Sequence, residues 1–287
     1  MPECRKAAAL PYPREVATDP LRDFILGHRR LFVLTGAGCS TDSGIPDYRD
    51  ADGAWKRKPP VMFRAFMDDL ATRKRYWARS LIGWRHFRHA APNEAHRALA
   101  RLEQRGRIEL LVTQNVDGLH QAAGSQAVVD LHGRVDRIRC MRCEVRSPRS
   151  TMQAALLSRN PGWETLDARI APDGDADLES VNFSAFEVPD CPHCGGILKP
   201  DVVFFGESVP HERVEAAMAA LARCDAMLIV GSSLMVYSGY RFAHAAAERG
   251  KSIAAVNLGR TRADDLLTLK VAQPCSAALA GLGTLPA

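Results

Sequence analysis

The sequence predicts an α/β fold: a Rossmann-like, doubly wound parallel sheet that carries a smaller inserted domain with zinc-binding and helical parts. Three observations predict it. Short apolar runs alternate with stretches of helical periodicity, as strands and crossover helices do in a parallel sheet. Glycine or polar residues follow the apolar runs, at the edge where such sheets bind ligands. Two segments, about 46–92 and 137–199, interrupt the alternation.

The expected elements follow from these patterns. The apolar runs predict strands over 31–34, 108–112, 128–131, 202–205, 227–230 and 253–256. Apolar residues at three- and four-residue spacing predict helices over 94–105, 212–222 and 240–249, and a further helix around 72–89. We expect the larger, nucleotide-binding domain to comprise residues 1–46, 93–136 and 200–287. The smaller domain then comprises 47–92 and 137–199.

Composition excludes several classes of protein. Hydrophobic content of 46% and charged content of 25% in 287 residues are ordinary globular values. The net charge of +5 is spread along the chain, so direct nucleic-acid binding is not expected, and basic residues over 73–107 are interpreted as a solvated helical face. No apolar run approaches the roughly 20 residues that span a membrane. The N-terminal apolar piece is too short for a signal peptide and is flanked by acids, which favours the cytoplasm.

A glycine-rich loop follows the first expected strand. Gly36-Ala37-Gly38 stands where glycines let a backbone approach a pyrophosphate at the start of a helix, expected near Thr41. Thr41 also occupies the position of the third glycine of the usual fingerprint. A structural tight turn therefore remains an alternative. The following segment, 44–49, carries Tyr48 and Arg49 on a loop that could close over a nucleotide.

Polar side chains follow two further strands. Gln114, Asn115 and Asp117 come just after the strand ending at 112 and could bind ribose hydroxyls or a carboxamide. For Asp117, capping a helix that begins near Gly118 is an equal alternative. His132 follows the next strand end, where an imidazole could accept a proton from a sugar hydroxyl. His96 and His120 lack such a setting and are interpreted as structural.

Two close cysteine pairs predict a metal site. Cys140 and Cys143, with Cys191 and Cys194, supply four thiolates for a tetrahedral zinc ion. The gap between the pairs exceeds that of a simple zinc ribbon, so an insertion lies between them. Redox chemistry at one pair is the competing interpretation, which the duplication disfavours. With all four ligands from protein, the zinc is structural.

Other candidate positions are less specific. Tyr76 and Arg79 lie three residues apart on an expected helix, as an anion-recognising pair or as a core tyrosine beside a surface arginine. Residues 231–234 and 257–259 form turns after the two last expected strands. Each is a weak signal alone.

Together these motifs resemble the sirtuin family of NAD-dependent protein deacylases. The matching pieces are residues 36–40, 44–49, 113–117, 131–133, the four cysteines, 199–207 and 231–233, in the family's order. Residues 76–79, 171–175 and 236–240 resemble the family's class II branch, which includes a mitochondrial sirtuin with ADP-ribosyltransferase and lipoamidase activities. Cys39 replaces an aliphatic residue usual in the first loop, and a small apolar thiol should be tolerated there.

The resemblance implies a division of roles among these residues. His132, Asn115 and Asp117 would be catalytic, with His132 accepting a ribose hydroxyl proton. The implied cofactor-binding residues are Gly36, Ala37, Gly38, Ser40, Ile45, Asp47, Tyr48, Arg49, Gln114, Asn115, Asp117, Gly231, Ser232, Ser233, Asn257, Leu258, Gly259 and Cys275. The implied substrate residues are Tyr76, Arg79, Val203, Phe204, Phe205, Gly206, Val236 and Tyr237. The acyl-lysine peptide would add a strand between 202–207 and 236–240.

The resemblance also implies the reaction. NAD is consumed as co-substrate, the acyl oxygen of an acyl-lysine attacks the ribose carbon, and nicotinamide and O-acyl-ADP-ribose are released. Protein mono-ADP-ribosylation or a lipoamidase-type activity at the same NAD site is the alternative, and a catalytically silent NAD- or zinc-binding module is a third possibility. The spacing of Tyr76 and Arg79 matches sirtuins that prefer succinyl and malonyl groups, but class II members carry the same pair, so the acyl group stays open.

Overall fold

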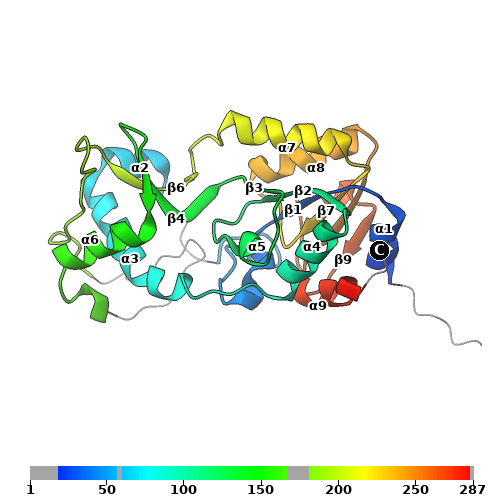
Figure 1. The fold of residues 1–287 in the computed structure, drawn as a ribbon, viewed down its shortest axis with the longest axis horizontal. Helices are drawn as coiled ribbons and strands as arrows, with labels where there is room; N and C mark the ends of the chain where they lie inside the picture. The colour runs from blue at the N-terminus through cyan, green and yellow to red at the C-terminus, as the bar shows by residue number, and fades with distance from the viewer. Residues whose placement is uncertain (1–18, 57–59, 167–180, 285–287) are drawn as a thin grey trace, which may run out of the picture.

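The computed structural model describes residues 19–56, 60–166 and 181–284. The described residues form two sheets, one six-stranded with the order β3-β2-β1-β7-β8-β9 and one three-stranded with the order β5-β4-β6. Figure 1 shows the two sheets at opposite ends of an elongated molecule. Residues 171–175, one of the segments that resemble class II sirtuins, lie outside the described residues, as does the N-terminal stretch 1–18.

The larger sheet is parallel throughout, as the sequence predicts. Its strands are β1 (Leu31–Thr35), β2 (Ile108–Thr113), β3 (Val128–Asp130), β7 (Ala226–Val230), β8 (Ser252–Val256) and β9 (Leu269–Val271). The accompanying helices are α1 (Pro20–Gly27), α4 (Glu94–Gln104), α5 (Leu119–Ala122), α7 (His211–Arg223), α8 (Tyr237–Glu248) and α9 (Cys275–Ala280). The strand order reverses between β1 and β7, which defines the point where doubly wound sheets bind ligands.

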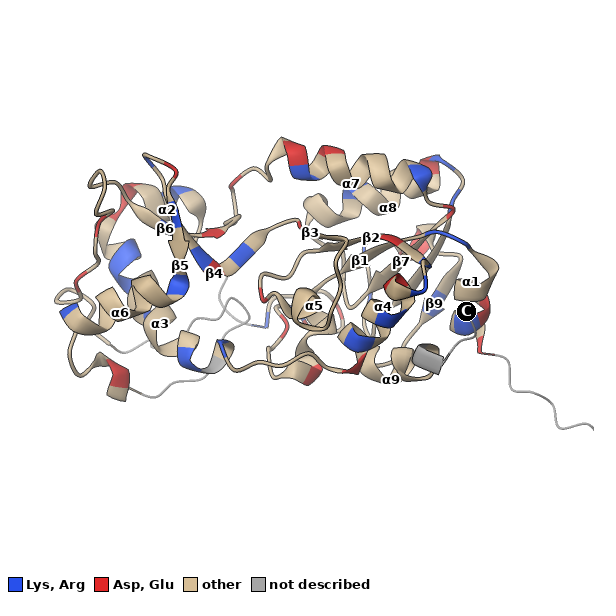
Figure 2. Ribbon diagram, viewed as in Figure 1, with Lys and Arg blue, Asp and Glu red and all other residues tan. Residues whose placement is uncertain are grey.

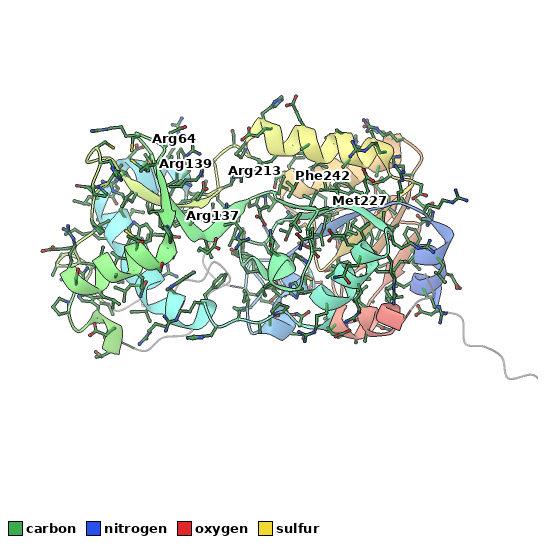
Figure 3. The ribbon with its side chains drawn as sticks, viewed as in Figure 1. Arg64, Arg137, Arg139, Arg213, Met227 and Phe242 are labelled. Carbon is green, nitrogen blue, oxygen red and sulfur yellow. The ribbon has the colours of Figure 1, made fainter. Side chains whose placement is uncertain are left out.

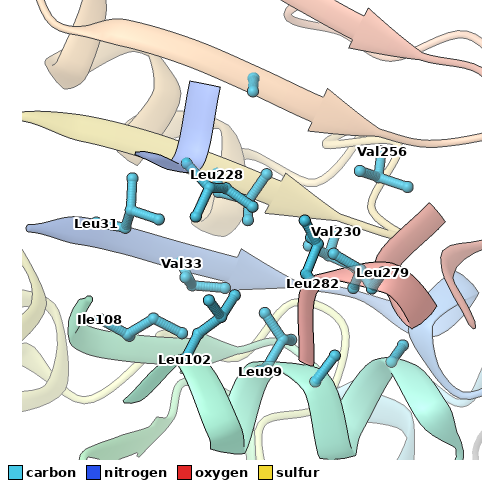
Figure 4. Packing of buried hydrophobic residues seen from close by; sticks show 14 of the residues in the cluster. Leu31, Val33, Leu99, Leu102, Ile108, Leu228, Val230, Val256, Leu279 and Leu282 are labelled. Atoms are coloured by element: carbon cyan, nitrogen blue, oxygen red, sulfur yellow. The ribbon is translucent and has the colours of Figure 1, made fainter. Parts of the chain in front are cut away.

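Both faces of this sheet are buried, so its strands are continuous apolar runs. Leu31 and Val33 of β1 point into a core shared with α1, α4 and α9, which Figure 4 shows from close by with Leu99, Leu102 and Leu279 around the strand. Phe32 and Leu34 point to the other side, into a core completed by α7 and α8. Figure 1 shows these two helices along one face of the sheet.

The smaller module combines the antiparallel sheet with helices. Its elements are α2 (Phe63–Asp68), α3 (Leu70–Phe87), β4 (Gly133–Cys140), β5 (Arg146–Pro148), α6 (Arg149–Arg159) and β6 (Leu198–Val202). Its core packs aromatic side chains such as Phe66 and Trp77 against β4 and α6. Arg149 is buried in this core, where its guanidinium lies over the Trp77 and Trp84 rings and donates to the Ser80 carbonyl. Aromatic faces and a carbonyl thus partly replace the water that this cation loses.

Short 3₁₀ turns complete the described structure, at Ala37–Cys39, Thr41–Ser43, Trp163–Thr165, Asp264–Leu266 and Gly281–Thr284. The sequence predicts a helix near Thr41, and the structure has only a three-residue 3₁₀ turn there, preceded by another at Ala37–Cys39. The loop after β1 is instead held by hydrogen bonds that span three residues, from the Cys39 and Ser40 N–H groups to the Gly36 and Ala37 carbonyls. These short turns keep the loop close to β7.

The expected strand over 202–205 is also not part of the parallel sheet. The preceding residues, 198–202, form β6, which pairs antiparallel with β4 in the small sheet. The apolar side chains that follow are used for packing, because Phe204 is buried against Phe66 and Tyr76 of the small module. The strands β4, β5 and β9 were not predicted. In the described part of the chain, no helix is long and apolar enough to cross a membrane.

Candidate active site

A cavity of about 1000 Å³ lies at the carboxyl ends of β1, β2 and β7. Its walls come from the loops after these strands on one side, and from segment 202–209 with Tyr76 of α3 on the other. The volume is at the upper end for sites that hold drug-sized ligands. The cavity therefore lies between the two sheets, at the point where the strand order of the larger sheet reverses.

The first wall consists of two glycine-containing loops in direct contact. The Gly38 N–H donates to the Gly231 carbonyl over 2.8 Å, and the Gly36 N–H donates to the Val230 carbonyl over 3.1 Å. A Cβ atom on Gly36 would lie 2.7 Å from the Ser232 Cβ, and one on Gly231 would lie 2.2 Å from the Cys39 nitrogen. Gly231 also has a φ of 64°. These glycines are required for the two loops to pack, whether or not they also let a pyrophosphate approach the backbone.

Ser40 joins the catalytic candidates Asn115 and Asp117. Its hydroxyl donates to an Asp117 carboxylate oxygen over 2.7 Å and accepts from the Asn115 amide over 3.0 Å. Asn115 also donates to the Gly36 carbonyl over 3.0 Å, and Asp117 accepts the Leu119 N–H over 2.9 Å. Burial raises the pKa of Asp117 despite these bonds. Asp117 therefore accepts the first N–H group of α5 from the position before the N-cap Gly118, and it also lines the cavity.

His132 is held at both ring nitrogens. Its Nδ1 lies 3.0 Å from the Gln114 carbonyl oxygen, and its Nε2 lies 2.8 Å from the Ser238 hydroxyl. Because a carbonyl can only accept, Nδ1 carries the proton and Nε2 presents its lone pair. Burial lowers the pKa of His132 to about 4, and the positive charge of Arg213 acts in the same direction. Figure 3 shows Arg213 at the start of α7, on the side toward the small module.

Gln114 connects the two halves of the first wall. Its side-chain oxygen accepts from the Ser232 hydroxyl over 2.6 Å. A Cβ atom on Gly239, at the start of α8, would lie 2.6 Å from the Gln114 amide nitrogen. The absence of a side chain at Gly239 thus leaves room for Gln114 beside α8. The sequence placed Gln114 at the cavity edge but gave no sign of these partners.

The second wall is aromatic. Phe205 packs against Trp55 and Tyr48 with ring centroids 5.5 and 6.4 Å apart. The Arg49 guanidinium lies 4.0 Å from the centroid of the Trp55 ring. Trp55 lines the cavity, but the sequence did not predict it. It lies beyond the 44–49 motif, in a segment without helical or strand periodicity.

The anchoring of segment 203–206 depends on Lys199 and Glu207. Lys199 is 3% exposed, and its ammonium donates to Glu207 over 3.0 Å. The same Glu207 oxygen accepts the Phe204 N–H over 2.9 Å. The Phe63 N–H donates to the Phe205 carbonyl over 2.8 Å. A buried ion pair and a backbone bond therefore fix the start and the middle of this segment.

The other expected substrate segment has a different form. Residues 237–240 are the first turn of α8, which begins at Tyr237. Val236, the residue before the helix, has an extended backbone with a φ of −86° and a ψ of 128°, and the addition of a peptide strand between 202–207 and 236–240 stays a prediction. Val236 and Tyr237 still line the cavity.

Tyr76 and Arg79 diverge although both lie on α3. Tyr76 is 5% exposed, contacts Phe66 and Phe204, and lines the cavity. Arg79 is half-buried, and among the described residues it is not one of those that line the cavity. All the other expected cofactor and substrate positions, together with His132, do line it.

The four paired cysteines converge in the small module. Their sulfur atoms all lie within 4.8 Å of one another, with Cys140 and Cys194 3.5 Å apart and Cys143 and Cys191 3.8 Å apart. Zinc–sulfur bonds of about 2.3 Å in a tetrahedron place sulfur atoms roughly 3.8 Å apart. The donor set and its spacing therefore fit a structural zinc ion.

The fold and the cavity define a class of protein: a doubly wound nucleotide-binding sheet joined to a zinc module, with polar catalytic candidates at the junction. The family profile described as "Sir2 family" matches residues 36–238. The chain belongs to the Sir2 family.

Curated and solved relatives agree with this assignment. The chain is 66% identical over 260 residues to a protein of Bordetella bronchiseptica named "NAD-dependent protein deacetylase", covering 91% of this chain and 95% of the relative. It is 65% identical to "NAD-dependent protein deacetylase 2" of Bradyrhizobium diazoefficiens, covering 93% and 98%. A solved structure described as "Sir2 bound to acetylated peptide" has a TM-score of 0.74 at 30% identity, covering 92% and 95%.

Proposed function

We propose that this chain is an NAD-dependent protein-lysine deacylase, acting on acyl-lysine in proteins or peptides. The observation that carries the proposal is the presence of His132, Asn115 and Asp117 around one cavity at the strand-order reversal. The names of the relatives and the acetylated peptide bound to a solved Sir2 structure support it.

NAD is the co-substrate, and the cavity fits it in size and in lining. The loops at 36–40 and 231–233 and the turn at 257–259 would hold its pyrophosphate and adenosine parts, while Asn115 and Asp117 would hold the nicotinamide end. NAD supplies the ribose carbon that takes the acyl oxygen and the nicotinamide that leaves. The direct contact of the first two loops supports a rigid seat for the dinucleotide.

His132 is the proposed proton acceptor. Its Nδ1 proton is directed to the Gln114 carbonyl, so the only lone pair available on the ring is that of Nε2. A pKa of about 4, lowered by burial, keeps this ring neutral near pH 7. A neutral imidazole with an oriented lone pair can take a proton from a ribose hydroxyl.

Substrate contact is proposed at the second wall. The segment 203–206 and the rings of Phe205 and Tyr76 would contact the peptide and its acyl-lysine. Because this wall is aromatic and Arg79 does not line it, we infer a preference for uncharged acyl groups over succinyl. Apolar burial favours an acyl chain, whereas an unpaired carboxylate there would lose hydration.

The four cysteines would hold one zinc ion that orders the small module. A fully protein-ligated zinc has no open position for substrate, so its contribution is to folding. We further propose that residues 1–46, 93–136 and 200–287 act as the NAD-binding domain and 47–92 with 137–199 as the small domain, with β4 and β6 joining them. Thiolates kept reduced for zinc favour a cytoplasmic location. The spread of the net charge of +5 along the chain argues against direct nucleic-acid contact.

The test is nicotinamide release from NAD with an acetyl-lysine peptide. We expect release to require both compounds and to yield the free-lysine peptide in equal amount. His132→Ala should abolish formation of the free-lysine peptide while retaining NAD binding in a calorimetric titration, since the ring accepts a proton from the ribose hydroxyl. Transfer of labelled ADP-ribose to protein, without any deacylated peptide, would replace this function by mono-ADP-ribosylation.

A further inference from the structure

Three potential metal ligands lie together beneath the first cavity loop, apart from the four-cysteine site. Cys39, His96 and His120 are each at most 1% exposed, and one potential ligand atom from each lies within 4.8 Å of the others. The Cys39 sulfur is 4.0 Å from the His96 Nε2. Gly38 and Ser40 line the cavity on either side of Cys39, so the cluster lies directly behind the cavity wall.

The hydrogen bonds of His96 leave one of its nitrogens for a ligand. Its Nδ1 lies 3.0 Å from the side-chain oxygen of Asn93. The amide of Asn93 donates to the Cys39 carbonyl over 2.8 Å, which fixes the orientation of its oxygen. The backbone N–H of Asn93 also lies 3.3 Å from Nδ1. Metal binding at Nε2, 4.0 Å from the Cys39 sulfur, therefore requires the tautomer that carries its proton on Nδ1, directed to the Asn93 side-chain oxygen. A partner on the distal nitrogen is what orients histidines that bind metals.

His120 shows the same arrangement with its nitrogens exchanged. Its Nε2 lies 2.9 Å from the Thr35 hydroxyl, which itself donates to the Thr113 hydroxyl over 2.8 Å. Thr35 therefore accepts the Nε2–H, and the lone pair is on Nδ1. That Nδ1 is buried and has no hydrogen-bond partner among the described residues. A buried acceptor without a partner is unfavourable unless a ligand or water occupies the site.

We propose that Cys39, His96 and His120 form a second metal site, for a thiophilic d¹⁰ cation, Zn²⁺ or Cu⁺. Metal–sulfur bonds of about 2.3 Å and metal–nitrogen bonds of about 2.0 Å require sulfur–nitrogen spacings of roughly 3.5–3.7 Å. The three ligand atoms, now within 4.8 Å of one another, reach the spacing of a tetrahedral site by a contraction of roughly 1.5 Å or less. One thiolate with two imidazoles is a ligand set that suits both ions.

Binding replaces a proton by the metal. The Cys39 S–H bond breaks, a sulfur–metal bond forms, the proton passes to solvent, and no atom changes oxidation state. Burial raises the pKa of the Cys39 thiol, and the charges of Cys275, Asp117 and Asp42 raise it further. The same negative charges favour a cation at this position. The resulting charge on the metal is thus partly compensated.

Metal at this position would act on the neighbouring catalytic candidates. His96 Nε2 is 3.4 Å from the Ser40 hydroxyl, the group that holds Asn115 and Asp117. Drawing His96 toward a metal removes this contact and displaces the loop. We therefore expect metal bound at this second site to inhibit the enzyme. This consequence rests on the proposed deacylase function, but the proposal that metal binds does not.

The experiment measures metal content and affinity in the full chain already holding one zinc at its four-cysteine site. Zn²⁺, or Cu⁺ under anaerobic conditions, is titrated against a chromophoric chelator. The unaltered protein should bind a second equivalent of at least one ion, with release of one proton. Cys39→Val, which restores an aliphatic side chain, and His120→Gln should bind only the first zinc. Cys224→Ala, which removes a buried thiol elsewhere, should keep both equivalents.

Co²⁺ gives a second measurement that is independent of activity. A thiolate-to-cobalt charge-transfer band should appear in the zinc-loaded protein and be lost in Cys39→Val. The proposal is overturned if neither ion binds beyond the first equivalent, which leaves His120 Nδ1 to buried water. It is equally overturned if Cys39→Val and His120→Gln, both folded by circular dichroism, bind the second equivalent as the unaltered protein does.

Discussion

The Ser238 hydroxyl donates to His132 Nε2 over 2.8 Å, across 106 residues of sequence. It occupies the lone pair through which His132 would accept the ribose proton. Together with the Gln114 carbonyl on Nδ1, it holds the ring at both nitrogens. Ser238 is therefore placed to position the imidazole before NAD enters, and to exchange with the ribose hydroxyl afterwards.

Replacing Ser238 by Ala should lower kcat about five- to tenfold with little change in KM for NAD. The lost bond is one hydrogen bond between neutral groups, worth about 0.5–1.5 kcal/mol, and its loss frees the ring to rotate about its remaining bond. Steady-state kinetics with the acetyl-lysine peptide measures the effect. Ser238→Thr keeps the hydroxyl and should restore most of kcat. A faster Ser238→Ala enzyme would mean that Ser238 competes with substrate and does not orient the ring.

Three buried histidines should make the protein less stable as the pH falls below neutrality. Burial lowers the pKa of His96 and His132 to about 4 and that of His120 well below its usual value. The unfolded chain, with histidine pKa values near 6.5, therefore binds more protons between pH 6.5 and 4. Each of His96 and His132 should then cost about 2 kcal/mol of unfolding free energy between pH 7.5 and 5.

Urea unfolding at several pH values measures this loss, and His132→Asn provides the comparison. The asparagine carries no titrating ring, so its stability should fall by about 2 kcal/mol less over the same interval. Above about pH 7.5 these histidines should contribute almost no slope. Equal pH dependence of the two proteins would contradict the assignment of His132 as a neutral, buried base.

Because the loops at 36–40 and 231–233 are in contact, adding one methyl group at Gly36 should lower both stability and NAD affinity. Gly36→Ala places its Cβ 2.7 Å from Ser232, which should cost about 1–3 kcal/mol through overpacking. NAD affinity should fall with it, because both loops line the cavity. Gly27→Ala is the matched control, since its Cβ meets nothing within 4 Å at the end of α1. Thermal melting and NAD titration of the pair test the prediction, which fails if both variants bind NAD like the parent.

How much of this site could be predicted depends on how far apart in the sequence the interacting residues lie. β1, β7 and β8 were predicted within a residue because both faces are buried and the sequence is apolar throughout. The loops that follow them were predicted from strand ends alone. Ser238 and Trp55 could not be found this way, because their partners lie on other elements.

Misassignment of 202–205 has a related cause. A short apolar run indicates burial without saying against what, and here Phe204 is buried in the small module rather than in the parallel sheet. β4 was missed because arginines and aspartate interrupt its buried positions. Likewise, spacing alone placed Tyr76 and Arg79 on one helix without fixing which of them faces the cavity.

Removing one zinc ligand should disorder the small module. Cys140 is fully buried beside the core formed by α3, α6 and β4, so Cys140→Ser should lose the zinc and several kcal/mol of stability. Metal analysis and differential scanning calorimetry measure the two losses. Cys224→Ala, which removes a thiol that contacts the Ala220 carbonyl instead, should keep the zinc of the four-cysteine site. Retained zinc and an unchanged Tm in Cys140→Ser would contradict the four-cysteine assignment.

The separation of Tyr76 from Arg79 makes a prediction about acyl preference. If Arg79 paired with an acyl carboxylate, Arg79→Gln would remove a charged hydrogen bond worth about 1.5–3 kcal/mol, and desuccinylation would fall roughly ten- to hundredfold. Arg79 does not line the cavity in the described structure, so we expect kcat/KM for acetyl and succinyl peptides to keep the same ratio within about twofold. Tyr76→Phe, at a position that does line the cavity, should change both rates together. A selective collapse of desuccinylation in folded Arg79→Gln would show that α3 turns Arg79 toward the substrate during turnover.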